Sequence, residues 1–383
     1  MPQRGPLSGI TVIDLSRILA GPYCTMLMAE LGARVIKVEP PKGGDDARAY
    51  GPFVKGHSAY FASINRGKES IALDLKAESD RRIFEKLLEK ADVLVENFRP
   101  GTMEKFGYGW ETLHPRYPRL IYAAASGFGH TGPNSQDPAY DMVVQGMGGI
   151  MSVTGFPGGQ PTRVGVSIGD VGSGIYTAVA VNAALLHRFR TGEATKVDIA
   201  MFDCQIALLE GVVVRYTTEG VVPGPVGSRH ATITPFQAFK TKDGNIIIAA
   251  GNDGLFLKLC DALGKPSMKT DPNYLTNDLR RNNQKRLEEE IEAILADRTT
   301  AEWIEIIGRA GVPCGPINNI AQALQHPQVA ARNMLITAPD GAGGTLKLSG
   351  NPLKMTAFED PPRRDAAPEL DANRAAILKE LGL

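Results

Sequence analysis

The hydrophobic positions of the first 130 residues alternate between short apolar runs and stretches with helical spacing. ITVIDLS at 10–16 predicts a strand, and AGPYCTMLMAELGA at 20–33 predicts a helix. Further segments continue the alternation: strands RVIKVEP at 34–40, SIALDLK at 70–76, DVLVENF at 92–98 and LIYAAAS at 120–126, and the helix AESDRRIFEKLLEKA at 77–91. This order favours an α/β domain with a mostly parallel sheet.

The pattern of apolar and polar positions changes twice in the residues that follow. Residues 141–153 and 173–189 predict apolar helices, TKVDIAM at 195–201 a strand, and 203–220 another helix. VVPGPVGSR at 221–229 is a Pro/Gly-rich connection, and a hairpin is predicted around Lys242-Asp243-Gly244. After about 328 the chain carries a β-like stretch and a final helix, which periodicity alone assigns to neither domain.

The length of 383 residues exceeds what one hydrophobic core usually supports, so we expect two domains. The large domain is expected at 1–200 and a smaller α+β domain at 225–325. Linkers are expected at 201–224 and 326–334.

Composition narrows the functional classes. Lys plus Arg equals Asp plus Glu at 42 each, so no overall field recruits nucleic acid or an anionic membrane. The four cysteines are far apart, and the six histidines form no metal-ligand spacing. No segment approaches the roughly 20 apolar residues of a membrane span. We therefore expect a cytoplasmic protein that binds neither nucleic acid nor membrane.

The motifs of common nucleotide enzymes are missing. The first predicted strand leads into Leu19-Ala20-Gly21-Pro22, which matches neither G-x-G-x-x-G nor the P-loop pattern. A G-x-S-x-G string occurs at 165–169, with Ser167 at its centre. Ser167 falls inside an apolar, strand-like run at 164–168 rather than at its end, which fits a hydrolase nucleophile poorly.

Asp170 stands out because glycines flank it at the start of an apolar helix. Partial burial and free helix amides would suit a nucleophilic carboxylate there. An aspartate that caps the helix is the alternative from pattern alone. A second signal is a set of cations, several of which follow predicted strands, where α/β sheets bind ligands. They are Arg17, Lys37, Arg66, Lys68, Lys76, Arg99 and Lys105.

Several segments together resemble the class III CoA-transferase family, and they run in order along nearly the whole chain. They include NRGKESIALDLK, ADVLVENFRPG, YDMVVQGMGGIMSVTG and GDVGSGIYTAVAVNAALLHRFRTG in the first half, and GVPCGPINNI farther on. The resemblance implies a Rossmann-like large domain completed by 335–383, a smaller inserted domain, and an interlocked homodimer. It implies CoA and acyl-CoA as substrates, with no tightly bound cofactor.

The resemblance also assigns roles to residues by position. It makes Asp170 the catalytic nucleophile, which would form a mixed anhydride and then an aspartyl-CoA thioester. CoA contacts would come from Arg17, Lys76, Asn97, Phe98, Arg99 and Lys105. Tyr60, Tyr140 and Asp141 would line the substrate site. Arg229 and His230 could hold a distal carboxylate, although a structural turn explains them equally well.

The resemblance also bears on which carboxylic acids would exchange CoA. Leu19 replaces the active-site glutamine of formyl-CoA transferase, and that enzyme's tetraglycine loop is missing, so oxalate and formate are not expected. The second-domain segments favour succinyl-CoA and a dicarboxylic acid. An α-methylacyl-CoA racemase on the same fold is the enzymatic alternative, but that branch carries His where this chain has Tyr140. A CoA-binding protein without activity is the non-enzymatic alternative.

Overall fold

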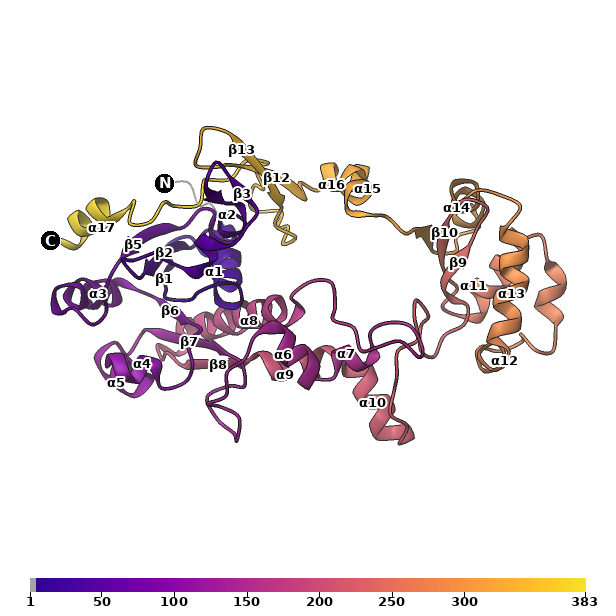
Figure 1. The fold of residues 1–383 in the computed structure, drawn as a ribbon, viewed down its shortest axis with the longest axis horizontal. Helices are drawn as coiled ribbons and strands as arrows, with labels where there is room; N and C mark the ends of the chain where they lie inside the picture. The colour runs from indigo at the N-terminus through magenta and orange to yellow at the C-terminus, as the bar shows by residue number, and fades with distance from the viewer. Residues whose placement is uncertain (1–4) are drawn as a thin grey trace. The chain divides into compact units, whose positions relative to one another are not determined.

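Two units, each with its own hydrophobic core, make up the chain in the computed structural model, which describes residues 5–383 (Figure 1). The first unit contains the chain up to Met151, Arg163–Val222 and Pro327–Leu383. The second contains Ser152–Thr162 and Pro223–His326. The chain therefore leaves the first unit and returns to it at the C-terminus.

A six-stranded parallel sheet forms the centre of the first unit, which confirms the predicted parallel sheet. Its order is β5 (Glu69–Ala72), β2 (Arg34–Glu39), β1 (Thr11–Asp14), β6 (Val93–Glu96), β7 (Ile121–Ser126) and β8 (Lys196–Ala200). Counted along the chain, this is the order 3-2-1-4-5-6 of doubly wound nucleotide-binding folds. The order reverses between β1 and β6, and such folds bind ligands at the carboxyl ends of the strands there.

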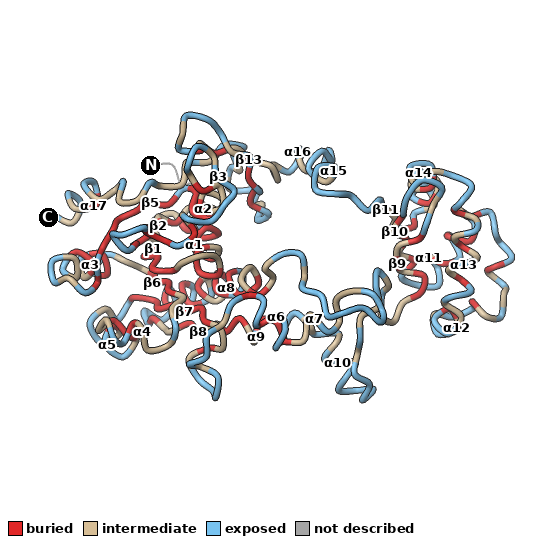
Figure 2. The backbone as a smooth tube through the Cα atoms, in the orientation of Figure 1, coloured by how far each residue is buried: buried red, intermediate tan, exposed pale blue. Residues whose placement is uncertain are grey.

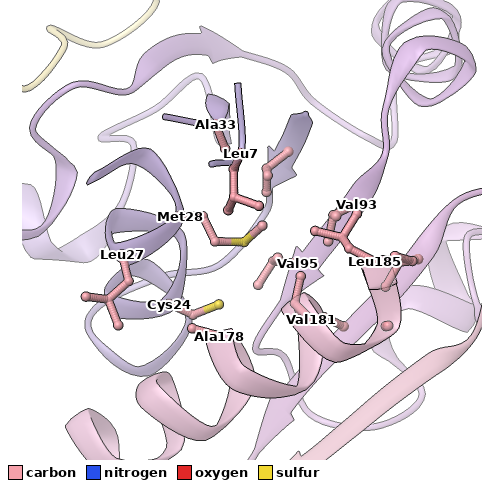
Figure 3. Close-up of a cluster of buried hydrophobic side chains, with 14 of the residues drawn as sticks. Leu7, Cys24, Leu27, Met28, Ala33, Val93, Val95, Ala178, Val181 and Leu185 are labelled. Atoms are coloured by element: carbon pink, nitrogen blue, oxygen red, sulfur yellow. The ribbon is translucent and has the colours of Figure 1, made fainter. Parts of the chain in front are cut away.

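Alternate residues of each strand enter two different cores, because successive side chains of a strand point to opposite faces. Val12 and Val95 face α1 (Ala20–Glu30) and α8 (Ile168–Thr191), in the core drawn in Figure 3. Ile13 and Leu94 face the other side, with α3 (Glu78–Lys90). Both faces of the sheet are therefore buried, as the band of red strands in Figure 2 shows.

Shorter helices complete the first unit. They are α2 (Ala59–Asn65), α4 (Thr102–Phe106), α5 (Trp110–Arg116), α6 (Asp141–Met147), α9 (Met201–Leu208), α10 (Glu210–Glu219) and the 3-10 turn η1 (Asp46–Ala49). The short helix α7 (Ile150–Val153) crosses the boundary between the two units at Met151. The single helix predicted at 141–153 is broken. Gly149 at the break has φ +86°, and a Cβ on Gly148 would lie 2.7 Å from the Val144 carbonyl oxygen. α6 ends at this glycine pair. Only glycine fits both positions, because a side chain would clash at Gly148 and would be strained at Gly149.

The C-terminal tail packs on the free edge of the sheet. Its hairpin consists of β12 (Leu335–Pro339) and β13 (Thr345–Ser349), and α17 (Arg374–Leu381) lies beside β5 and α3. The Ser70 amide donates to Asn373 Oδ1 at 2.9 Å, and the Ala72 amide donates to Asp371 Oδ1 at 2.7 Å. The tail thus binds backbone groups that an edge strand would otherwise leave open. The small hairpin of β3 (Phe53–Val54) and β4 (His57–Ser58) and the helix α16 (Pro327–Ala331) also belong to this unit.

The second unit contains an antiparallel sheet of β11 (Cys314–Pro316), β10 (Asn245–Ala249) and β9 (Phe236–Lys240). The hairpin predicted around Lys242-Asp243-Gly244 is the turn between β9 and β10. Its helices are α11 (Asp253–Ala262), α12 (Asn277–Asn282), α13 (Gln284–Leu295), α14 (Thr300–Arg309), α15 (Ile320–Gln325) and η2 (Pro266–Thr270). Phe239, Ile291 and Trp303 belong to its core.

Candidate active site

Asp170 lies in the first turn of α8, as its third residue. The N-cap is Ser167, so the interpretation of Asp170 as the helix cap is wrong. The helix begins five residues earlier than predicted, and the strand predicted at 164–168 is absent. A hydrolase elbow requires such a strand before its serine, so the structure does not provide the context for Ser167 as a nucleophile.

Asp141 holds this first turn through a carboxylate whose two oxygens are both used. Oδ1 accepts the Gly169 amide at 2.8 Å, and Oδ2 accepts Gln145 Nε2 at 2.8 Å. Gln145 is fully buried, and its Oε1 accepts the Val164 amide at 2.9 Å. Asp141 and Gln145 are one helical turn apart in α6, so this helix fixes the chain on both sides of the α8 start.

The charge of Asp170 is disfavoured where it lies. Burial, and then the negative charge of Asp141, raise the pKa of Asp170 to about 7. Within residues 5–383 no group donates a hydrogen bond to its carboxylate, and its backbone carbonyl accepts Ser173 Oγ at 2.9 Å. The positive end of the helix opposes these effects. A carboxylate in this position is poorly solvated and free to react with an electrophile.

Close packing of α1 and α8 sets the direction in which Asp170 points. Asp170 and Gly174 are four residues apart and share one face of α8. A Cβ on Gly174 would lie 2.7 Å from the Ala20 carbonyl oxygen, so this face of α8 lies against the start of α1. Tyr60 of α2 is close enough that the Asp170 charge contributes, after burial, to raising the Tyr60 pKa to about 12. Asp170, Asp141 and Tyr60 therefore come together.

A second group of predicted residues meets where the strand order reverses. Arg17 follows β1 and Asn97 follows β6, the two strands at that point. Asn97 accepts the Arg17 amide at 2.7 Å and donates to the Arg17 carbonyl oxygen at 2.8 Å. The Arg17 guanidinium pairs with Asp46 at 2.9 Å, and both side chains are partly exposed. Asn97 thus fixes the loop that presents Arg17.

Glu96 holds the next turn. It is buried at the end of β6, where burial raises its pKa to about 7. Its Oε2 accepts the Phe98 amide at 2.7 Å, and its Oε1 accepts the Tyr122 hydroxyl at 3.1 Å. Asn97 and Phe98, which are both half-buried, are thereby held at the carboxyl edge of the sheet.

Apart from Arg17, the candidate cations divide into two kinds. Lys76, Arg99 and Lys105 are exposed and make no ion pair with residues 5–383. Lys76 follows β5, whereas Arg99 and Lys105 follow β6. Exposed cations without partners at this edge are available to an anionic ligand.

Three of the cations in the set are structural and are not free to contact a ligand. Lys37 is buried and pairs with Asp45 at 2.8 Å. Lys68 is buried and pairs with Asp14 at 3.0 Å. Buried Arg66 likewise pairs with Glu30, at 2.7 Å. A buried charge requires such a partner, so these side chains are occupied within the protein.

The remaining predicted residues are Tyr140, Arg229 and His230. Tyr140 is the N-cap of α6, and its side chain is 71% exposed. Arg229 and His230 belong to the second unit. The Arg229 side chain donates to the Val226 carbonyl oxygen and to Gln284. His230 Nδ1 accepts the amides of Thr232 and Ile233, both at 3.2 Å.

Two residues near Asp170 were missed in the sequence. Gln145 could have been found from its i, i+4 spacing to Asp141 in a predicted helix. Arg163 lies 3.6 Å from Asp141, between Nη2 and Oδ2, and no spacing rule connects residues 22 positions apart. Residues 5–383 contain no cluster of three metal-ligating side chains. One described helix, α8, has the length and apolar composition of a membrane span, but it packs against α1 in the core.

Comparisons with known proteins agree with this geometry. Residues 7–374 match the CoA-transferase family III. An acetyl-CoA:oxalate CoA-transferase of Acetobacter aceti is 46% identical over 98% of this chain and 96% of its own length. A succinate–glutarate CoA-transferase of Agrobacterium fabrum is 39% identical over 100% of this chain and 97% of its own.

Solved structures give the same result. The crystal structure of a CAIB/BAIF family protein from Brucella suis superposes with a TM-score of 0.86 and is 38% identical, covering 99% of this chain and 100% of that protein. The racemase alternative is not favoured, since the relatives named above are transferases. The chain belongs to CoA-transferase family III, and it is a class III CoA-transferase.

Proposed function

We propose that this enzyme moves CoA from an acyl-CoA donor, with succinyl-CoA as the first candidate, to a small dicarboxylic acid, with Asp170 as the nucleophile. The observation that carries the proposal is the Asp170 carboxylate in the first turn of α8, partly desolvated and without a hydrogen-bond donor. The names of the two relatives, which specify oxalate, succinate and glutarate, support a dicarboxylic acid.

In the first half-reaction an Asp170 oxygen attacks the thioester carbonyl carbon, and the carbon–sulfur bond breaks. The products are a mixed anhydride and CoA thiolate. The thiolate then attacks the aspartyl carbonyl carbon, which releases the donor acid as its carboxylate and leaves an aspartyl-CoA thioester. The acceptor carboxylate repeats these steps in reverse order, which restores the Asp170 carboxylate. No proton, electron or nucleotide is consumed.

The chain must retain CoA while the acids exchange. Arg17, Lys76, Arg99 and Lys105 are proposed to bind its phosphates, and Asn97 and Phe98 its nucleotide end. Their positions at the carboxyl edge of β1, β5 and β6 support this assignment. Tyr60 and Asp141 are proposed to line the acyl site, and Tyr140 beside them. No tightly bound cofactor is part of the proposal.

The identity of the acids needs a wider screen than the sequence indicated. Leu19 and the absent tetraglycine loop argue against oxalate, but the Acetobacter relative is named for that acid. Arg229 and His230 remain candidates for a carboxylate contact, although Arg229 donates to Val226 and Gln284 and His230 accepts the Thr232 amide within its turn. Succinate, glutarate and oxalate should each be assayed as acceptors, with both succinyl-CoA and acetyl-CoA as donors.

A homodimer with interlocked chains in the cytoplasm is proposed as the working form. Large apolar side chains that α8 and α10 leave exposed support an interface there. Phe189 is 87% exposed and Val214 59%, and α10 has no buried residue. Monomeric soluble proteins rarely leave contiguous apolar patches of large area uncovered.

Replacing the nucleophile tests the reaction. Asp170→Ala should abolish acyl exchange between labelled succinate and succinyl-CoA, a loss of at least about 1,000-fold, because it removes the group that forms the intermediate. CoA affinity, measured by equilibrium dialysis, should change little. Asp297→Ala, at an exposed position of the second unit, is the matched control and should retain activity. Substantial exchange by Asp170→Ala would refute the assignment.

A further inference from the structure

Arg163 carries a guanidinium that the protein itself leaves without a hydrogen-bond partner. Its side chain is 42% exposed and lies five residues before the start of α8. The contact to Asp141 Oδ2, at 3.6 Å, is an ion pair too long for a hydrogen bond. No other contact of its side chain is found within residues 5–383.

Asp141 does not hydrogen-bond the Arg163 donors in this structure, and each of its oxygens already accepts one other hydrogen bond. Gly169 and Gln145 each donate to one oxygen at 2.8 Å. Arg163 therefore stands beside the carboxylate without the two parallel bonds that guanidinium and carboxylate groups form when they bind each other. The planar fork remains free for another carboxylate.

The backbone on both sides of Asp141 fixes the distance between Arg163 and the reacting residue. The Val164 amide, directly after Arg163, donates to Gln145 Oε1 at 2.9 Å. Gly169, directly before Asp170, donates to Asp141. Asp141 and Gln145 thus hold the two ends of the segment that separates a cation from the nucleophile.

A dicarboxylic acyl group needs a cation near this nucleophile. When one end of the acyl group reacts at Asp170, the other end carries a negative charge close to Asp141. The charged neighbour that raises the pKa of Asp170 is Asp141. An unpaired carboxylate in a partly desolvated site is costly, whereas a bond to a guanidinium is among the strong ones.

We propose that Arg163 binds the distal carboxylate of a dicarboxylic acyl group while its other end reacts at Asp170. This inference rests on the proposed function. It concerns acids such as succinate and glutarate, whose carboxyl groups are separated by methylene groups. The two carboxyl carbons of oxalate are bonded directly to each other, and the proposal does not extend to that acid.

A simpler role for Arg163 is that of a counter-ion to Asp141. In that case its removal would make the site more negative for every substrate. The pH at which activity appears would then rise by the same amount with any donor. A distal-carboxylate contact instead affects only donors that carry a second carboxylate.

The experiment compares succinyl-CoA with acetyl-CoA as donors to the intact enzyme. For each donor, kcat/KM and its pH profile are measured for the wild type, Arg163→Gln and Arg163→Lys. Formation of the CoA adduct at Asp170 is followed by mass spectrometry. With succinyl-CoA, Arg163→Gln should lose about 10- to 100-fold in kcat/KM, mainly through a higher KM. With acetyl-CoA it should stay within about threefold of the wild type, and Arg163→Lys should recover part of the loss.

The outcomes distinguish a failure of the role proposed for Arg163 from a failure of the proposed function on which it rests. Equal losses for both donors, an equal shift of both pH profiles, or no loss for succinyl-CoA would overturn the role of Arg163. An adduct of the wild type with acetyl-CoA but not with succinyl-CoA would also overturn it and leave the nucleophile standing. Failure of the wild type to form an adduct with either donor would refute the proposed function itself. CoA binding by each variant confirms that it is folded.

Discussion

Opposing effects act on the negative charge of the Asp170 side chain. Its helix position favours a negative charge, while burial and the neighbouring Asp141 disfavour it, with the net result that its pKa is raised to about 7. The folded protein therefore holds a proton on this group more tightly than the unfolded chain does. Residues arranged for reaction in this way reduce the stability of the fold.

Asp170→Asn should consequently stabilise the enzyme while it removes activity. Stability is lost as the pH rises from the unfolded value of 3.8 through the folded value of about 7, because only the unfolded chain then ionises freely. At pH 8 the variant should be more stable than the wild type by on the order of 2–4 kcal/mol. Urea unfolding at pH 8 and pH 4 measures this difference.

The same comparison contains its own control. At pH 4 Asp170 is protonated in the folded wild type, so the advantage of the asparagine should nearly vanish. An equal advantage at both pH values would show that the gain comes from packing and not from charge. If Asp170→Asn were less stable than the wild type at pH 8, the result would contradict the view that Asp170 carries a disfavoured, buried charge.

At the scale of elements, the six strands of the parallel sheet and the longer helices of the first unit could be predicted from the sequence, whereas the hairpin of β3 and β4 and the short helices α2, α4 and α5 were not. The alternation that places Val12 in one core and Ile13 in the other is visible in the residues themselves. We predicted the start of α8 five residues too late. Gly169 and Gly172 have low helix propensity, and VGVSI at 164–168 alternates apolar and small residues as a strand does. Tertiary contacts from α6 determine this helix end, and a single segment does not show them.

The buried ion pairs also could not be predicted from the sequence. Lys37 and Lys68 have the sequence appearance of surface charges, since lysine is almost never fully buried without a partner. Their partners lie at Asp45 and Asp14, the latter 54 residues from Lys68. The strand order brings Lys68 and Asp14 together, because the strands that follow Lys68 and end at Asp14 belong to one sheet. The sequence therefore predicted the presence of cations at this edge but not which of them are free.

Lys68 anchors the element junction next to the site. Its ammonium donates to Asp14 at 3.0 Å, to Thr25 Oγ1 at 2.8 Å and to Asn65 Oδ1 at 2.8 Å, which ties β1, α1 and α2 together. Lys68→Met should destabilise the fold by about 3–5 kcal/mol, because it leaves a buried carboxylate without its cation.

Urea unfolding with a matched lysine tests that value. Lys86 makes an exposed ion pair with Glu89, so Lys86→Met should cost less than about 1 kcal/mol. Similar costs for the two variants would mean that the buried network contributes no more than a surface pair.

At the scale of the whole molecule, the two ends of the chain share one unit. The tail binds the edge strand β5 through Asp371 and Asn373, and Ile377 of α17 is buried in the core beside α3. Periodicity could identify the final helix but not its partner, because pairing between segments 300 residues apart leaves no local pattern. The family resemblance supplied what periodicity could not, and it also named the reaction.

The covalent intermediate is the most direct test of the account. The wild-type enzyme is mixed with succinyl-CoA without an acceptor, quenched in acid, digested and analysed by mass spectrometry. A parallel sample is treated with hydroxylamine, which converts the aspartyl thioester to a hydroxamate. The account predicts that CoA, or the hydroxamate, is found on Asp170 and that Asp170→Asn carries neither. Transfer that proceeds with no adduct, or with the adduct on another residue, would contradict it.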